Sequence, residues 1–122
     1  MKAVPNAKLG GFFVMETKIY KNGKITIKLK NKGSIWIYDI DKIGGYISRI
    51  YIYPKYQNKG CGTELLNKAV ELFKASGCES VRLHVSCENS GAIRLYKKQG
   101  FFIIVKVSKK KNPHYLMAMQ LK

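Results

Sequence analysis

The chain has 122 residues, 46% of them hydrophobic, which fits one domain (residues 1–122) with a buried core. Its 23 lysines and arginines against 7 acids give a formal net charge of +16. Such a charge attracts polyanions, but compositional bias explains most of it, so nucleic acid is a possible but not a favoured partner. No apolar run reaches about 18 residues, which excludes a membrane-spanning helix. Residues 1–11 make a poor signal peptide, so we expect a cytoplasmic protein.

The three cysteines are an odd number without C-x-x-C spacing. We therefore expect reduced thiols rather than a disulfide framework. A zinc site from Cys78, His84 and Cys87 is conceivable, but its spacing matches no common zinc pattern. No metal is expected.

Alternating and β-branched residues predict strands, amphipathic spacing predicts helices, and residues 1–11 read as a loose segment. Asn22-Gly23 indicates a hairpin turn, Gly77 ends the first helix, and Asn89 can cap a second helix that stops at Gly100. The expected strands are residues 12–20, 25–29, 34–39, 46–53, 81–85, 101–107 and 115–121, and the first helix is residues 64–76.

The resulting order is β-β-β-β-α-β-α-β-β. The central strand–helix–strand unit implies a parallel crossover, and the hairpins at either end imply antiparallel pairing. The expected fold class is therefore α/β (α+β): a single domain with a mixed, mostly antiparallel sheet.

The most informative stretch lies between the fourth strand and the first helix. It reads Gln57, Asn58, Lys59, Gly60, Cys61, Gly62, Thr63. Glycines let an anion approach the main chain closely, and a helix N-terminus favours negative charge. The spacing does not match the Walker loop or the dinucleotide fingerprint, and by itself the stretch is equally well a plain turn before a helix.

Gln-x-x-Gly-x-Gly after a strand resembles the acyl-coenzyme A loop of GCN5-related N-acetyltransferases, the GNAT family. A second block, at about the family's separation, is similar to its strand-Asn-helix-Tyr-Gly-Phe segment. It consists of Leu83 to Asn89, Ala92, Ile93, Leu95, Tyr96, Gly100 and Phe101. The resemblance covers roughly residues 34–121 and implies acetyl transfer from acetyl-coenzyme A to an amine. Leu83-His84-Val85 also resembles a segment of the protein N-terminal acetyltransferases.

The resemblance implies a binding role for two groups of residues. Main-chain groups of the fourth strand would hold the pantetheine arm, and the loop amides would hold the diphosphate. The expected cofactor-binding residues are Ile50, Tyr51, Ile52, Gln57, Asn58, Lys59, Gly60, Cys61, Gly62, Thr63, Asn89 and Tyr96. Asn89 is an equally good plain helix cap.

The resemblance also implies that Tyr96 protonates the departing thiolate; the alternative is a core aromatic residue. Many members use a glutamate before the glycine loop as base, but residues 44–60 contain no acid. His84 is the alternative base, with Tyr46 at about the matching place on the earlier strand. A purely structural histidine fits the sequence equally well.

One departure from the family concerns the acceptor side. The family usually has one or two helices after its first strand, and here only the Asn22-Gly23 turn is available. The acceptor side is therefore reduced, built differently, or completed by a partner chain such as the second copy in a homodimer. An acidic peptide amine is the expected acceptor because the surroundings are cationic: Lys55, Lys59, Lys97, Lys98, Lys109, Lys110 and Lys111. The rival interpretations are a non-catalytic coenzyme A-binding protein and a nucleic-acid-binding module.

Overall fold

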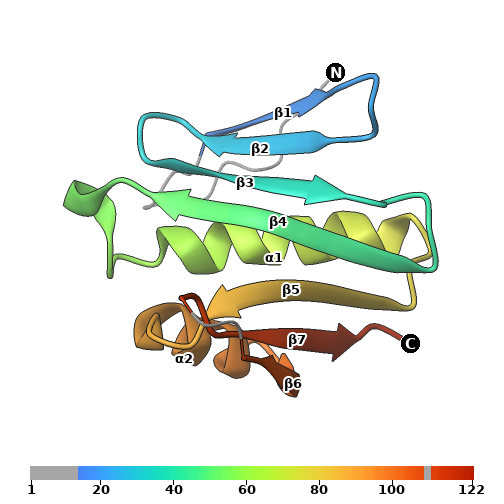
Figure 1. Ribbon diagram of the computed structural model, residues 1–122. Coiled ribbons are helices and arrows are strands. Elements are labelled where there is room, and N and C mark those ends of the chain that lie inside the picture. Colours follow the sequence, from blue (N-terminus) through green and yellow to red (C-terminus); the bar gives the residue numbers. More distant parts are fainter. Residues whose placement is uncertain (1–13, 109–110) are drawn as a thin grey trace.

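The computed structural model describes residues 14–108 and 111–122. The predicted order of elements is confirmed (Figure 1). The loose segment expected at residues 1–11, the start of the first strand, and Lys109 and Lys110 lie outside the described residues. The elements are β1 (Met15–Ile19), β2 (Ile25–Leu29), β3 (Gly33–Tyr38), β4 (Gly44–Ile52), a 3-10 turn (Pro54–Tyr56), α1 (Cys61–Ala75), β5 (Ser80–Ser86), α2 (Ser90–Lys98), β6 (Phe102–Val107) and β7 (His114–Gln120).

All seven strands form one sheet in the order β1-β2-β3-β4-β5-β7-β6. Only β4 and β5 pair in parallel, from Gly44 opposite Ser80 to Ile47 opposite Leu83, and α1 makes the crossover between them. Every other pairing is antiparallel. The mixed, mostly antiparallel sheet expected from the sequence is therefore confirmed.

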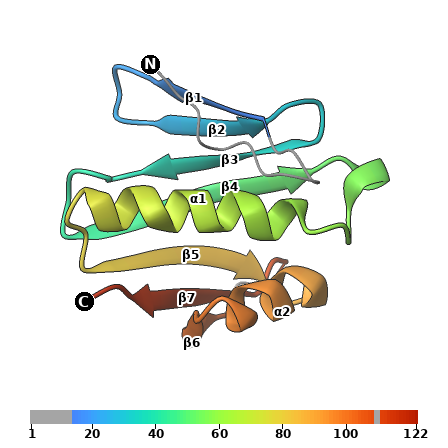
Figure 2. The same cartoon turned by 180° about the vertical axis from the view of Figure 1, so that it is seen from behind.

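Both helices lie on one face of the sheet, in front of it in Figure 2. The apolar stripe of α1 is fully buried against alternate residues of the strands, and α2 adds Tyr96 to the same core. Helix α1 approaches β4 so closely that a Cβ on Gly45 would lie 2.3 Å from the Phe73 ring. The principal core residues are Ile27, Ile35, Ile37, Ile47, Leu65, Leu66, Ala69, Phe73, Val81, Leu83 and Met117.

The opposite face carries no helix in the described part of the chain. The reason is visible in the sequence: β1 and β2 are joined by a tight turn in which the Gly23 N–H donates to the Tyr20 carbonyl (3.1 Å). Among the described residues, β2 therefore follows β1 with no helix between them, which agrees with the reduced or absent first helical pair expected from the sequence. Within the described ranges, no helix is both long and apolar enough to cross a bilayer.

Strand β4 changes course halfway along its length. Its pairing with β3 shifts between Trp36 and Ile37, so Ser48 is the extra residue of a β-bulge. Its pairing with β5 ends at Ile47, although both strands continue. The two parallel strands therefore diverge toward their carboxyl ends, and the divergence opens a gap in the sheet.

Candidate active site

A cleft of about 590 Å³ lies where β4 and β5 diverge. Its walls come from the end of β4, the loop before α1, the first turn of α1, and one side of α2. The lining residues are Ile50, Tyr51, Ile52, Tyr56, Gln57, Asn58, Gly60, Gly62, Thr63, Asn89, Gly91, Ala92, Arg94, Leu95 and Lys98. A volume of this size is typical of small-molecule sites.

The loop before α1 is shaped by two residues in the left-handed region. Asn58 has φ 61° and Gly60, the N-cap of α1, has φ 86°. Helix α1 begins at Cys61, earlier than predicted, so Gly62 and Thr63 belong to its first turn. The first N–H groups of a helix have no partner within it. Where the loop meets the cleft, these N–H groups can bind an anion, and the positive end of the helix dipole favours its negative charge.

The end of β4 supplies main-chain groups to the same cleft. The Tyr53 N–H donates to the Lys32 carbonyl (2.8 Å), so Tyr53 and Tyr51 are the residues that bond to β3 in the alternating antiparallel ladder. Ile50 and Ile52 therefore direct their N–H and C=O groups toward β5. That side is where the strands have diverged, so these groups face the gap.

Gln57 makes a hydrogen bond that its predicted role did not include. Its side-chain amide donates to the Ile52 carbonyl (3.0 Å), so it ties the loop to the end of β4 and occupies one of the acceptors there. Gln57 still lines the cleft. Its contact is nevertheless that of a residue that positions the loop.

Most of the residues expected to bind the cofactor line the cleft; Lys59, Cys61 and Tyr96 do not. Lys59 is exposed, and Cys61 is buried in the core at 3% exposure. Only the main-chain amide of Cys61 could serve the predicted role. Asn89 lines the cleft and also caps α2, since its side-chain oxygen accepts from the Ala92 N–H (3.2 Å).

Tyr96 is 5% exposed, and its ring packs 5.8 Å from that of Phe101. Burial raises the pKa of Tyr96 to about 12. The phenol therefore keeps its proton throughout the physiological range. It can act as a hydrogen-bond donor but not as a base.

Two cations on α2 were missed as cleft residues from the sequence. Arg94 and Lys98 both line the cleft, opposite the N-terminus of α1. Arg94 was not named, and Lys98 was named only as part of the cationic surroundings. Residues four apart share one side of a helix. With Tyr96 in the core and Gly91 and Leu95 in the cleft wall, the spacing of Arg94 and Lys98 could have identified them.

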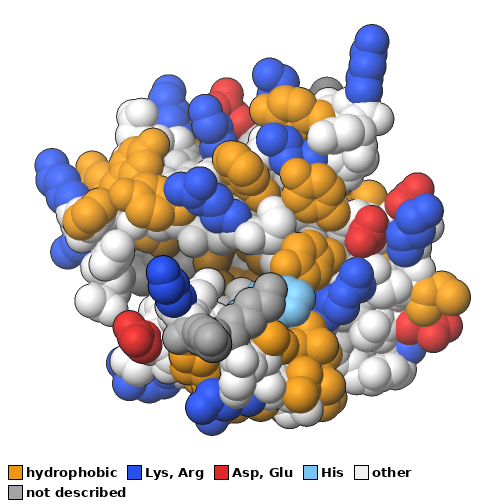
Figure 3. All heavy atoms as spheres, viewed as in Figure 1, with side chains coloured by type: hydrophobic (Ala, Val, Ile, Leu, Met, Phe, Trp, Pro, Cys, Tyr) orange, Lys and Arg blue, Asp and Glu red, His pale blue; other side chains and the backbone are white. Residues whose placement is uncertain are grey.

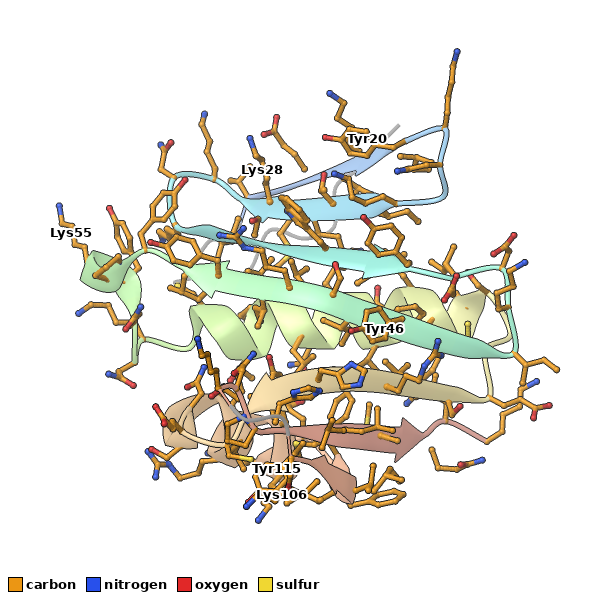
Figure 4. All side chains as sticks on the ribbon, viewed as in Figure 1. Tyr20, Lys28, Tyr46, Lys55, Lys106 and Tyr115 are labelled. Carbon is orange, nitrogen blue, oxygen red and sulfur yellow. The ribbon has the colours of Figure 1, made fainter. Side chains whose placement is uncertain are left out.

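Tyr46 and His84 meet on the open face of the sheet (Figure 4 labels Tyr46). The Tyr46 hydroxyl lies 3.0 Å from His84 Nδ1. His84 follows Leu83, the last residue of β5 that pairs with β4, so it stands where the strands begin to diverge.

His114 is a third member of this group that the sequence did not reveal. Its ring lies 5.1 Å from that of His84 in a T-shaped arrangement. Its Nδ1 is 3.1 Å from the Asn112 carbonyl, which can only accept, so Nδ1 carries the proton. The neighbourhood arises because β7 pairs with β5 with His114 opposite Ser86.

The cysteines do not form the conceivable zinc site. The Cys78 thiol is buried and donates to the carbonyls of Lys42 (3.1 Å) and Ile40 (3.4 Å). Burial, with Asp41 and Asp39 nearby, raises the pKa of Cys78. Among the described residues, no group of three or more metal-ligating side chains gathers at one point.

A family model described as the acetyltransferase (GNAT) family matches residues 7–101. An uncharacterized N-acetyltransferase of Methanocaldococcus jannaschii is 40% identical over 92 residues, which are 75% of this chain and 38% of that protein. The N-alpha-acetyltransferase MAK3 of Arabidopsis thaliana is 37% identical over 57 residues, 47% of this chain and 30% of that one. The chain therefore spans well under half the length of these relatives.

Among solved structures, an IAA acetyltransferase from Bacillus cereus superposes with a TM-score of 0.77. The match covers 88% of this chain and 99% of that chain at 19% identity. At such identity the likeness shows the shared fold.

Proposed function

This chain belongs to the GNAT family of acetyltransferases, and we propose that it transfers an acetyl group from acetyl-coenzyme A, the family's donor, to a primary amine. One observation carries the proposal. The cleft with the glycine loop at one end lies where β4 and β5 diverge, and the Tyr46–His84 pair stands where that divergence begins. This arrangement supports a donor site on one side of the gap and a proton acceptor on the other.

The cleft residues fit the donor in charge and shape. The amides of the loop from Asn58 to Thr63, at the positive end of α1, suit its diphosphate. Arg94 and Lys98 add positive charge from the opposite wall. The β5-facing main-chain groups of Ile50 and the N–H of Ile52 suit the amide groups of the pantetheine arm. This arm would lead from the loop to the start of the gap.

The reaction needs few groups, because a thioester is already activated and positioning supplies much of the rate. The amine lone pair attacks the acetyl carbonyl carbon, a C–N bond forms, and the C–S bond breaks. The amine loses a proton, which we assign to His84, directly or through one water. Tyr46 orients the imidazole through its hydroxyl. The electron pair of the broken bond leaves on the thiolate.

We assign Tyr96 the role of hydrogen-bond donor to that thiolate. Its pKa of about 12 exceeds the ~8.5 of an ordinary thiol, so complete proton transfer is uphill. A hydrogen bond still stabilises the developing negative charge. Solvent then supplies a proton to the released thiolate, which becomes the free thiol.

A peptide amine, at a protein N-terminus or on lysine, is the acceptor that we favour. The matching relatives include an N-alpha-acetyltransferase, and the open face around His84 suits an extended chain better than a small closed pocket would. A cationic face also favours acidic peptides over a free polyamine.

Mass spectrometry of peptides and polyamines after incubation with acetyl-coenzyme A tests the proposal. We expect an added acetyl group on a peptide amine and release of one thiol per transfer. Strand β4 carries no acid, which favours the non-catalytic alternative. Ligand-induced stabilisation by acetyl-coenzyme A with no thiol release on any amine would establish that alternative.

We also propose a homodimer through β6. This strand forms one edge of the sheet, and its apolar residues Phe102, Ile104 and Val105 are about half exposed. Unprotected apolar edges favour pairing with another strand, and a second copy offers the same edge. Light scattering should give twice the chain mass, and Ile104→Lys should halve it. Ile19→Lys, at the β1 edge, is the control; a single-chain mass at all concentrations would contradict the dimer.

A further inference from the structure

Cations and aromatic rings alternate across the open face of the sheet. The Lys24 ammonium lies 4.4 Å from the centre of the Tyr20 ring and 4.3 Å from that of Trp36. The Arg49 guanidinium lies 5.3 Å from Trp36 and 5.5 Å from Tyr51. We call this series the cation–aromatic ladder; its members are Lys18, Tyr20, Lys24, Trp36, Arg49 and Tyr51.

The ladder runs across the strands, from the β1–β2 hairpin to the cleft. Figure 4 labels Tyr20 at the hairpin end, and Figure 3 shows blue cations interspersed with orange side chains over the same face. Trp36 lies opposite Arg49 on β3 and β4. Tyr51 is both the last ring of the ladder and a residue of the cleft wall. The ladder is therefore a continuation of the candidate active site.

The ladder's cations are fixed in place but not neutralised. The ion pairs between described residues join Lys68 to Glu71 and Arg82 to Asp39, and neither involves a ladder cation. A cation over a ring is partly ordered and still has N–H donors directed outward. Such groups meet an incoming carboxylate at a reduced entropic cost.

We propose that the cation–aromatic ladder binds an acidic segment that follows the acetylated amine in the acceptor peptide. This inference rests on the proposed acetyl transfer and names the surface and the register that select the acceptor. The amine sits at the Tyr46–His84 pair, and the chain then runs over β4, β3 and β2 toward the hairpin. Carboxylates of the peptide pair with Arg49 first and Lys24 next.

Strand spacing fixes the register. Neighbouring strands are ~4.8 Å apart, and an extended peptide advances ~3.3 Å per residue. Arg49 is on the strand next to His84, about two residues of peptide away. Lys24, the residue before β2, is about two strands or ~10 Å beyond Arg49 across the sheet, which corresponds to about three more residues. Acidic residues are therefore favoured at the second or third and at the fifth or sixth positions.

Single-stranded nucleic acid is the other polyanion that a cationic, aromatic surface could attract. Such binding relies on bases stacking on free ring faces. In the ladder, cations already lie over the rings of Tyr20, Trp36 and Tyr51. Carboxylates need only the outward N–H groups, so the arrangement favours an acidic peptide.

The test compares hexapeptides with a free amine that carry acids at the third and sixth positions, at neither, or lysines there instead. For wild type we expect kcat/KM to be about 3- to 10-fold higher for the acidic than for the neutral peptide, since each exposed charge pair contributes little. The ratio should approach one in Arg49→Gln and Lys24→Gln. Arg49→Glu should shift the preference toward the lysine peptide. Added salt should lower the wild-type ratio.

Lys74→Gln is the matched control, because it removes one exposed positive charge from α1, on the opposite face. If Lys74→Gln and Arg49→Gln lose the preference for the acidic peptide equally, the preference comes from net charge and the proposed role of the ladder is wrong. Oligouridylate bound by wild type and lost in Arg49→Gln, with peptide preference unchanged, would overturn it in favour of nucleic acid. If wild type acetylates the acidic and neutral peptides with equal kcat/KM, the proposed role of the ladder is wrong but the proposed function stands. No acetylation of any amine refutes the proposed function.

Discussion

The two faces of the sheet use alternate residues of the same strands for different purposes. On β3, Ile35 and Ile37 are fully buried under α1, and Trp36 between them points to the open face and contacts Arg49. On β5, Leu83 is 1% exposed in the core, and the next residue, His84, meets Tyr46 on the open face. The side chains of the covered face stabilise the fold, and those of the open face are candidates for catalysis and acceptor binding.

This separation follows from the period of two in a strand and from the missing helices between β1 and β2. The two faces meet only where β4 and β5 diverge, because there the sheet no longer separates them. The donor cleft borders the helices, and the proposed acceptor comes from the open face. Substitutions on the two faces should therefore affect different quantities, stability on one and activity on the other.

The largest effect is expected from His84→Gln on the open face. Glutamine can still contact the Tyr46 hydroxyl, but it cannot take a proton. We expect kcat to fall ~10²–10⁴-fold, the range of general acid–base groups, and the acidic limb of the pH–rate profile to flatten. Thermal unfolding should hardly change, because His84 is exposed.

Lys28→Gln, assayed with a neutral peptide, is the control for this variant, because Lys28 is a cation of the same face on β2 (labelled in Figure 4). An unchanged acidic limb in His84→Gln would move the base role to another group or to water. A large loss of stability in His84→Gln would show that side chains of the open face also stabilise the fold.

Gly45→Val, on the covered face, should have the opposite effect, because it should lower stability. A Cβ there would lie 2.3 Å from the Phe73 ring, and Phe73 is fully buried. Overpacking of this kind typically costs ~1–3 kcal/mol, so the urea midpoint should fall markedly. The neighbouring Gly44→Ala, with its nearest neighbour at 3.4 Å on the flexible Arg82 side chain, should cost much less. Equal midpoints for the two variants would contradict this account of the covered face.

Gly62→Val tests the place where the faces meet. A Cβ on Gly62 would lie 3.2 Å from the Leu95 side chain across the cleft and 4.0 Å from Ile52. The larger side chain should narrow the cleft and weaken acetyl-coenzyme A binding at least ~10-fold, or ~1.4 kcal/mol. Calorimetric titration measures this, with circular dichroism to verify folding. Wild-type affinity in a folded variant would refute the placement of the donor.

Local patterns were sufficient to predict the elements, and the resemblance to the GNAT family supplied most of the candidate-site residues. Alternation along Ile25–Leu29 and the Asn22-Gly23 turn depend on neighbours in sequence, as does the stripe of α1. The bulge at Ser48, the position of His114 beside His84, and the ladder from Lys24 to Arg49 depend on strand register instead. Register is set by packing between distant segments, which one sequence does not display. The site features that were missed are therefore mostly those made by pairing between strands.

The smallest effect concerns Tyr96, which belongs to the covered face by burial and to the candidate site by its proposed role. Its pKa is raised to about 12 from an ordinary value of ~10, so the folded state favours the neutral phenol. The associated stability is present below about pH 10 and is lost as pH rises toward 12. At about pH 11, one pKa unit of this difference corresponds to ~1.4 kcal/mol.

Tyr96→Phe has no proton to lose, so its free energy of unfolding should fall by about that much less than that of the wild type between pH 8 and 11. Urea unfolding of both proteins at the two pH values measures the difference, and the titration of all other groups cancels. Equal losses of stability in the wild type and in Tyr96→Phe would mean that the Tyr96 hydroxyl reaches solvent through the cleft. Tyr96 would then belong with the solvent-accessible residues of the candidate site rather than with the buried residues of the covered face.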